Sequence, residues 1–162
     1  MSEIAVREMR AGDLEQVNAL RACIQQLHHK GRPDLFLPAS AAHGELARQF
    51  MQRENGRVLV AARGERVLGY AVTQDISREA NPYMLARRFV HVEEFCVDAN
   101  HRREGVGRAL AEAIRADARA RGFARVELDV WAFNEDARRF YEAMGFHSYR
   151  CFMELDTGSA QA

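Results

Sequence analysis

The sequence predicts an α/β fold in which a mixed β-sheet is covered by helices. Three observations carry this prediction. Apolar residues recur at helical spacing in some segments and alternate in others, so that predicted helices and strands take turns along the chain. Residues 89–130 form a strand, a helix and a strand with short connections, which favours a right-handed parallel crossover. A tight turn between two earlier strands favours antiparallel pairing, so the sheet is expected to be mixed.

The first half of the chain predicts a strand, two helices and a hairpin. Residues 4–7 form a short strand, and Asp13 is suited to cap a helix that Gly31 and Pro33 end. A loop follows over residues 28–38, and Ser40 is suited to cap a second helix that ends before Gly56. The apolar positions that predict the two helices are Leu14, Val17, Leu20, Ile24 and Leu27, and then Ala42, Leu46 and Phe50.

The second half completes a β-α-α-β-β-β-α-β-α-β order. Residues 58–62 and 67–76 predict the hairpin, and a polar connection over residues 77–88 leads to a strand at 89–97. A helix over 105–121 ends at Gly122, and the alternation of residues 125–130 predicts the next strand. A helix over 135–144 ends at Gly145, and residues 147–155 predict a final strand.

Length and composition indicate one soluble domain. The 162 residues are 48% hydrophobic and 28% charged, which suits one domain over residues 1–156 with a polar, frayed tail at 157–162. The 23 basic and 23 acidic residues cancel, which disfavours a uniformly basic nucleic-acid binder. Neither a membrane-spanning run nor an apolar signal core is present, and the three separated cysteines favour reduced thiols. We therefore expect a cytoplasmic protein.

The stretch 102–108, between a predicted strand and a predicted helix, carries the strongest chemical signal. Gly105 and Gly107 allow a tight turn and a close approach of a ligand to the main chain. The first amides of the next helix and the positive end of its dipole favour a pyrophosphate, and the three arginines of the stretch can add charged contacts. On the glycines alone, an ordinary turn with solvated arginines is the simpler interpretation. Neither GxxxxGK[ST] nor a complete GxGxxG is present, which argues against an NTPase or a Rossmann site.

A second stretch, residues 134–146, predicts a capped amphipathic helix. Asn134 occupies the expected N-cap, and Tyr141 lies two turns later at the edge of an apolar stripe that contains Phe140. Taken by itself, this stretch has a purely structural interpretation.

Together the stretches resemble the GCN5-related N-acetyltransferase (GNAT) superfamily. Arg102-x-x-Gly105-x-Gly107 matches its [RQ]-x-x-G-x-[GA] acyl-CoA pyrophosphate loop. Residues 134–146 are similar to its second CoA motif, and residues 92–97 to its fourth strand. The resemblance extends over residues 4–155. It implies the acyl-CoA N-acyltransferase fold, with a splayed sheet of about six to seven strands, about four flanking helices and acetyl-CoA in the gap.

The resemblance also implies which residues bind acetyl-CoA as a co-substrate, with no metal. Backbone groups of the fourth strand would hold the pantetheine and the thioester, and amides of the loop would cradle the pyrophosphate. Asn134 would contact the pantetheine arm, and Tyr141 would protonate the departing thiolate. The expected binding residues are Phe95, Cys96, Val97, Arg102, Arg103, Glu104, Gly105, Val106, Gly107, Arg108, Asn134 and Tyr141.

A base is also needed, because an alkyl amine with a pKa of about 10 arrives protonated. Strict alternation along the strand places His91 and Glu93 on one face and Glu94 on the other. The resemblance implies a base at His91 or Glu93. His91 has a suitable unperturbed pKa of about 6.5, whereas Glu93 would need a raised pKa or a water relay. Both residues can equally line the pocket without a proton role.

The sequence therefore predicts an acetyl-CoA-dependent N-acetyltransferase that acts directly on a primary amine of a small molecule, protein or peptide. The alternative is a non-catalytic module that binds and senses acyl-CoA, against which the intact Tyr141 and Glu93 weigh. Residues 28–38 and 77–88 are expected to select the acceptor, because loops vary around a fixed scaffold. No nucleic-acid or membrane partner is expected, and the C-terminal strands are compatible with a homodimer.

Overall fold

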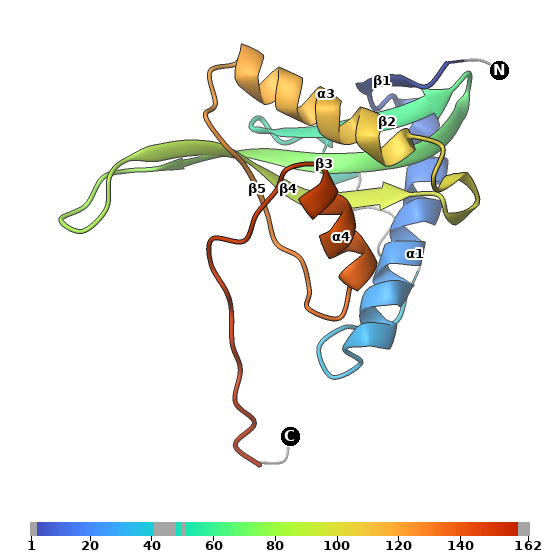
Figure 1. The fold of residues 1–162 in the computed structure, drawn as a ribbon. Helices are drawn as coiled ribbons and strands as arrows, with labels where there is room; N and C mark the ends of the chain where they lie inside the picture. Colours follow the sequence, from blue (N-terminus) through green and yellow to red (C-terminus); the bar gives the residue numbers. More distant parts are fainter. Residues whose placement is uncertain (1–2, 41–47, 50, 159–162) are drawn as a thin grey trace.

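A computed structural model of the chain describes residues 3–40, 48–49 and 51–158 and contains one five-stranded sheet (Figure 1). The neighbours β1 to β4 pair antiparallel, and β4 and β5 pair parallel, in the order β1-β2-β3-β4-β5. The predicted α/β fold with a mixed sheet is thus confirmed. The strands are β1 Ala5–Glu8, β2 Gly56–Arg63, β3 Arg66–Arg78, β4 Arg87–Val97 and β5 Val126–Leu128.

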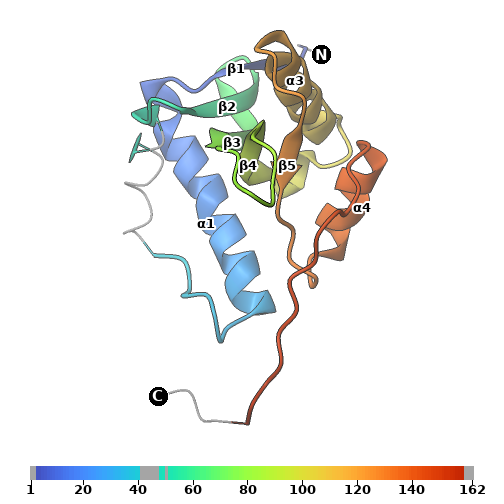
Figure 2. The ribbon, with the colours of Figure 1, turned by 90° about the vertical axis from the view of Figure 1, so that its left-hand side faces the viewer.

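Helices cover both faces of this sheet. Helix α1 (Leu14–Gly31) lies against one face, and α3 (Val106–Ala120) lies against the other, where α4 (Glu135–Ala143) also packs beside the end of β4 (Figures 1 and 2). Helices α3 and α4 follow their sequence signals: apolar positions recur at every fourth residue of α3, and Asn134 caps α4 by accepting a hydrogen bond from the Ala137 amide. Asp13 lies at the N-cap of α1 as expected, but its carboxylate accepts from Arg7 and from the Arg10 amide and makes no cap hydrogen bond to α1.

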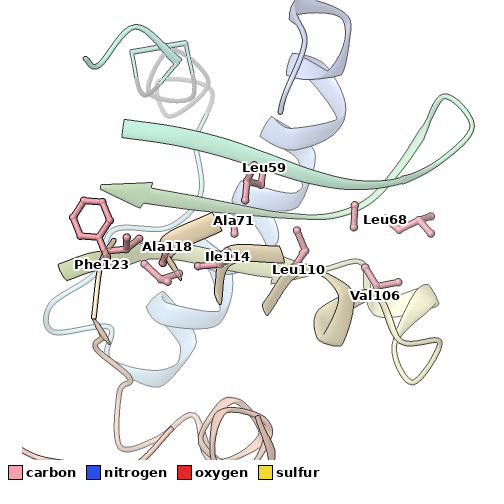
Figure 3. Close-up of a cluster of buried hydrophobic side chains, with 11 residues drawn as sticks. Leu59, Leu68, Ala71, Val106, Leu110, Ile114, Ala118 and Phe123 are labelled. Atoms are coloured by element: carbon pink, nitrogen blue, oxygen red, sulfur yellow. The ribbon is translucent and has the colours of Figure 1, made fainter. Parts of the chain in front are cut away.

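The core consists of two apolar clusters, one on each side of the sheet. Under α3, Leu110 is fully buried and Ile114 nearly so, against Leu68 and Ala71 of β3 (Figure 3). Under α1, Val17 and Tyr70 are fully buried. Burial of each large apolar side chain stabilises the fold by about 1.5–3 kcal/mol, so these clusters hold the sheet that positions the site.

The sheet opens between β4 and β5. The parallel ladder joins only Val90–Val92 of β4 to Val126–Leu128 of β5. Strand β4 continues for five more residues to Val97, and in the part of the chain that the structure describes no strand pairs with it there on the β5 side. The splayed sheet implied by the resemblance is therefore observed, at this position.

A β-bulge interrupts the alternation of β4 and corrects one expectation. Val72 pairs with Glu94 while Thr73 pairs with Val92, so that Glu93 is an extra residue in β4. Val92 and Phe95 both pack on the α3 side, and Glu94 contacts α1. The prediction that Glu93 and Glu94 lie on opposite faces was wrong, because strict alternation does not survive a bulge.

The final strand predicted at residues 147–155 does not form, so the observed sheet is smaller than the expected six to seven strands. The segment leaves α4 in an extended conformation and runs away from the body (Figure 1). A strand needs a neighbouring edge that satisfies its amides and carbonyls, and within residues 3–40, 48–49 and 51–158 none pairs with this segment.

Other boundaries also differ from the predictions. Helix α1 continues through His28 to Gly31, and cross-strand pairing extends β3 to Arg78 and starts β4 at Arg87. The two loops expected to select the acceptor, over residues 28–38 and 77–88, are therefore both shorter in the structure than predicted. The predicted helix at residues 40–50 lies mainly outside the described residues, so the structure gives three long helices against the four expected. None of the helices in the described part is long and apolar enough to cross a membrane.

Candidate active site

The open stretch of β4 exposes main-chain groups at the centre of the molecule. Phe95 and Val97 point towards α3 and α4, and Cys96 points towards α1. Because this stretch pairs with β3 on one side only, its remaining amides and carbonyls face the gap. The three strand residues expected to bind acetyl-CoA thus lie where the sheet offers free backbone groups.

The loop after β4 leads into the N-terminus of α3 and places unpaired amides beside this gap. Gly105 has a φ of 86° and Arg103 a φ of 67°, so two residues of the loop adopt the left-handed conformation of a tight turn. The Ala109 amide donates to the Gly105 carbonyl at 2.9 Å. The amides of residues 106–108 precede this bond and are available to an anion.

Gly107 is required by the packing of this site. A Cβ atom there would lie 3.1 Å from the ring of Phe140 in α4, and 3.5 Å from Val97. The missing side chain therefore lets α4 press against the first turn of α3 and against β4. The two motifs that stand more than 25 residues apart in the sequence meet at this residue.

Charged side chains surround the same turn. The Glu104 carboxylate accepts from Arg63 at 3.0 Å, and His101 Nδ1 lies 3.1 Å from it. These contacts lower the pKa of Glu104, chiefly through the Arg63 hydrogen bond. The three arginines of the loop, by contrast, are exposed and form no ion pair with any described residue: Arg102, Arg103 and Arg108.

Tyr141 lies on the same side of the sheet as the loop. Its ring packs on Phe95 with centroids 5.9 Å apart and on Phe146 at 5.6 Å. It lines a small apolar cavity with Val92 and Leu128, at the point where β4 and β5 part. Burial raises the pKa of Tyr141 to about 12, so the phenol stays protonated at neutral pH and remains a proton donor.

Cys96 is a structural thiol on the other side of the strand. Its Sγ donates weakly to the carbonyl of Leu20 in α1 at 3.7 Å. Burial raises the pKa of Cys96 to about 12, which leaves little thiolate at neutral pH. The side chain is therefore suited to packing and not to nucleophilic attack.

The two base candidates lie on the face of β4 that looks towards α1. His91 Nε2 is 3.8 Å from Asp129 Oδ2, just after β5. Both oxygens of Glu93 accept from Arg53 Nη1 at 3.1 Å. The described contacts bring neither residue against Tyr141, which packs from α4 on Phe95. The acid candidate and the base candidates therefore lie on opposite sides of β4.

Glu94 is the residue that the sequence analysis misplaced. Arg21 of α1 donates to its two oxygens at 2.8 and 2.6 Å, and the Tyr70 hydroxyl donates to Oε2 at 2.8 Å. Burial, with the Glu94 charge, raises the pKa of Tyr70 well above its usual range. A signal existed: apolar residues occupy positions 90 and 92 and then 95 and 97, a change of phase at Glu93 that indicates a bulge.

An aromatic cluster joins the segment after α1 to the segment after β5. Phe36 contacts His28 and Trp131 with ring centroids 4.9 and 5.1 Å apart, and Phe133 stacks on Trp131 at 6.2 Å. Burial lowers the pKa of His28. The cluster places two segments that are about a hundred residues apart beside the α1 side of the gap.

The fold and these contacts define an α/β protein in which β4 loses its parallel neighbour beside the N-terminus of α3 and the ring of Tyr141. The chain belongs to the acetyltransferase (GNAT) family: the sequence profile of that family matches residues 21–146. This match covers both motif-bearing stretches and the open part of β4.

Three known proteins illustrate the similarity. The [ribosomal protein bS18]-alanine N-acetyltransferase of Escherichia coli K12 is 31% identical over 104 residues, which are 64% of this chain and 57% of that relative. The tetramutant of the BH1408 protein from Bacillus halodurans superposes with a TM-score of 0.88 at 31% identity, over 94% of this chain and 99% of that one. The aminoglycoside N-acetyltransferase AAC(6')-Iy in complex with CoA shares the fold, with a TM-score of 0.74 at 19% identity over 98% and 97%.

Proposed function

We propose that this protein transfers the acetyl group of acetyl-CoA directly to a primary amine of a small molecule, protein or peptide. One observation carries the proposal: β4 loses its parallel neighbour at the point where the N-terminus of α3 and the Tyr141 ring meet it. That juxtaposition offers a backbone edge, an anion site and a proton donor along a single cleft. Family membership supports the same activity.

The proposed binding mode uses groups that are free in the structure. The amides of residues 106–108 and the exposed Arg102, Arg103 and Arg108 suit a pyrophosphate. The open backbone of residues 95–97 suits the amides of a pantetheine arm. The side-chain oxygen Oδ1 of Asn134 caps α4. Its side-chain nitrogen Nδ2 is therefore the group that could donate to the pantetheine arm.

Tyr141 is the proposed general acid. The acceptor nitrogen attacks the thioester carbonyl, the C–S bond breaks, and the Tyr141 hydroxyl supplies a proton to the departing sulfur. The apolar surroundings keep the phenol protonated before the reaction and also make a free thiolate costly there, so the proton is expected to pass to the sulfur as the C–S bond breaks.

His91 is the proposed base, with Glu93 as the second candidate. His91 would take a proton from the acceptor amine, and Asp129 Oδ2, 3.8 Å from its Nε2, lies close enough to orient the ring. Both oxygens of Glu93 already accept from Arg53 Nη1, so this carboxylate is less free to meet an incoming amine. A larger fall of kcat in His91→Asn than in Glu93→Gln, at equal acetyl-CoA affinity, supports this assignment; the reverse order would favour Glu93.

The charges near the cleft favour an acceptor with a single amine. Three carboxylates on this side already have an arginine partner: Glu93 with Arg53, Glu94 with Arg21, and Glu127 with Arg87. A polycation would have to displace these arginines. The acetylation of a ribosomal-protein alanine by one relative makes peptide N-termini a natural first class to test.

The test combines calorimetric titration of acetyl-CoA with a thiol-release assay on simple alkyl amines and peptides with different N-terminal residues. We expect micromolar binding of acetyl-CoA and turnover with at least one class of monoamine. Absence of binding up to millimolar acetyl-CoA would overturn the proposal. Binding without turnover across the panel would instead favour the non-catalytic sensing module.

A further inference from the structure

The aromatic cluster of His28, Phe36, Trp131 and Phe133 is only partly covered by the rest of the protein. All four residues are partly exposed, and Trp131 is exposed to 40%. Leu35, next to Phe36, is half-exposed as well. Large rings that a fold brings together and leaves partly open are typical of a binding surface, whereas the rings of a closed core are buried.

The segment after α1 is fixed on that helix, so the cluster keeps its shape without a ligand. The Phe36 amide donates to the Arg32 carbonyl at 3.0 Å, and the Phe36 carbonyl lies 2.6 Å from His29 Nδ1. Gln25 Nε2 donates to the carbonyl of Leu37 at 2.5 Å. A surface that is already ordered loses little conformational entropy when a ligand binds to it.

The segment after β5 is fixed in the same way. Gly31, the last residue of α1, makes room for the ring of Phe133, because a Cβ atom at Gly31 would overlap that ring. Trp131 stacks on Phe133 and meets Phe36 edge to face, with centroids 6.2 and 5.1 Å apart. A further ring, supplied by a ligand, can extend this series of aromatic contacts on the exposed part of Trp131.

A charged pair lies two residues before Trp131. The Asp129 carboxylate is 3.8 Å from His91 and is 77% exposed, so it can still meet the ammonium group of a ligand. Burial lowers the pKa of His28, so this imidazole is neutral at neutral pH and does not repel an ammonium. The Cα atoms of residues 129 and 131 are at most about 7 Å apart, a separation that a ring two or three bonds from a nitrogen can bridge.

We propose that the aromatic cluster and Asp129 together bind a primary amine that carries an aromatic ring two or three bonds from its nitrogen. The inference rests on the proposed function, in which this amine is the acetyl acceptor. Its ammonium would lie against Asp129 and His91, and its ring would pack on Trp131. A small arylalkyl amine and a peptide with an aromatic first residue share this chemistry.

A free carboxylate beside the amine gains little at this surface. Arg32, directly after α1, already binds Asp34 and Glu154, each at 2.6 Å. A carboxylate of the ligand would have to compete with these two acidic side chains for the guanidinium. We therefore expect amides and peptides to be better acceptors than the corresponding free amino acids.

Acceptor kinetics at saturating acetyl-CoA test the proposal. We expect kcat/KM for phenylalanine amide to exceed the values for alanine amide and for free phenylalanine at least tenfold. Trp131→Ala should bring the ratio of phenylalanine amide to alanine amide towards one, and Trp131→Phe should restore part of it. Tyr83→Ala is the matched control and should keep the ratio, because Tyr83 is 94% exposed on the β3–β4 turn.

Two further acceptors distinguish the sources of the ring. Faster turnover of a tripeptide that begins with phenylalanine than of phenethylamine would indicate a peptide N-terminus. The reverse order would indicate a small arylalkyl amine. Either order, with both acceptors better than their alanine-derived or ethyl counterparts, supports the proposal.

Trp131 is the single tryptophan of the chain, so its emission reports on the cluster without any acetyl transfer. With CoA present and no acetyl donor, phenylalanine amide should shift this emission saturably to shorter wavelength as its ring covers Trp131. Alanine amide should need at least a tenfold higher concentration for any shift.

The two readouts separate this inference from the proposed function. An emission shift without turnover supports the aromatic site and counts against acetyl transfer. Equal kcat/KM for phenylalanine amide and alanine amide overturns the inference and leaves acetyl transfer intact. So does a preference that survives Trp131→Ala. Absence of both turnover and an emission shift overturns both.

Discussion

The two faces of β4 differ in the polarity of their side chains. Towards α3 and α4, β4 presents apolar side chains such as Val92 and Phe95, which pack on rings and aliphatic residues. Towards α1 it presents His91, Glu93 and Glu94, each held by a charged group from another part of the chain. The apolar face contributes the size of its side chains and free main-chain groups to the site. The α1 face contributes paired charged side chains.

This difference suggests which face binds an invariant ligand and which face can change its preference for an acceptor. Free amides and close packing suit a ligand part that never changes, because they depend on main-chain geometry and on one or two glycines. Single substitutions can change paired side-chain charges. Under the proposed function, we therefore expect acceptor preference to vary on the α1 face. The following variants test each face separately.

The largest effect is expected from Gly107→Glu on the apolar face. The new side chain would meet Phe140 and place a negative charge at the proposed pyrophosphate site, so acetyl-CoA affinity should fall at least a thousandfold, or about 4 kcal/mol. Calorimetric titration measures this. Gly12→Glu is the matched control, because nothing lies within 4 Å of a Cβ there. Equal affinity in Gly107→Glu and wild type would remove the anion site from α3.

Arg21→Met tests the charged face. It leaves Glu94 and the buried Tyr70 hydroxyl without the guanidinium, which is 9% exposed, and should lower the free energy of unfolding by about 2–3 kcal/mol. Urea denaturation measures the loss. The double variant Arg21→Met, Glu94→Gln should recover part of it, since it removes the uncompensated charge. Additive losses would show that the two side chains are not coupled.

Tyr141→Phe tests the proposed acid. We expect kcat to fall at least tenfold, or about 1.4 kcal/mol, with acetyl-CoA affinity little changed, because the ring and its packing remain. Steady-state kinetics with the acceptor found above measures this. Tyr83→Phe is the control, since Tyr83 is 94% exposed on the β3–β4 turn. An unchanged kcat would exclude Tyr141 as the acid.

The smallest effect concerns acid stability near the start of α1. The Arg7 hydrogen bonds lower the pKa of Asp13 below its usual 3.8, against the opposing effect of burial. A depressed carboxyl pKa contributes stability above the unfolded value and loses it as pH falls through the folded value. Asp13→Asn should therefore lose about 1 kcal/mol at pH 7, and the gap to wild type should close below about pH 4.

Urea denaturation at neutral and acidic pH measures this effect. Glu112→Gln, at an exposed position of α3, is the control and should track the wild type at every pH. A constant gap between Asp13→Asn and wild type across the pH range would mean that the Arg7 contact does not set the acid sensitivity of this region.

Local signals predicted much of the fold and part of the site. The helix over 105–121, the N-cap at Asn134 and the loop at 102–108 were predicted from spacing, capping residues and glycines, and the structure places them as expected. Two features were not predicted. The side of β4 on which Glu94 lies depends on the bulged pairing with β3, and residues 147–155 form no strand because no neighbouring strand pairs with them in the described chain.

The sequence by itself determined the mixed α/β fold, the glycine-rich turn before α3 and the capped helix that bears Tyr141, because these depend on residues close together in the chain. Only the tertiary structure decided that Gly107 admits Phe140, that a bulge turns Glu94 towards Arg21, and that residues 147–155 pair with no strand of the described chain. Those features depend on contacts between residues far apart in the chain, and local propensity carries no information about which edge, ring or charge will be opposite.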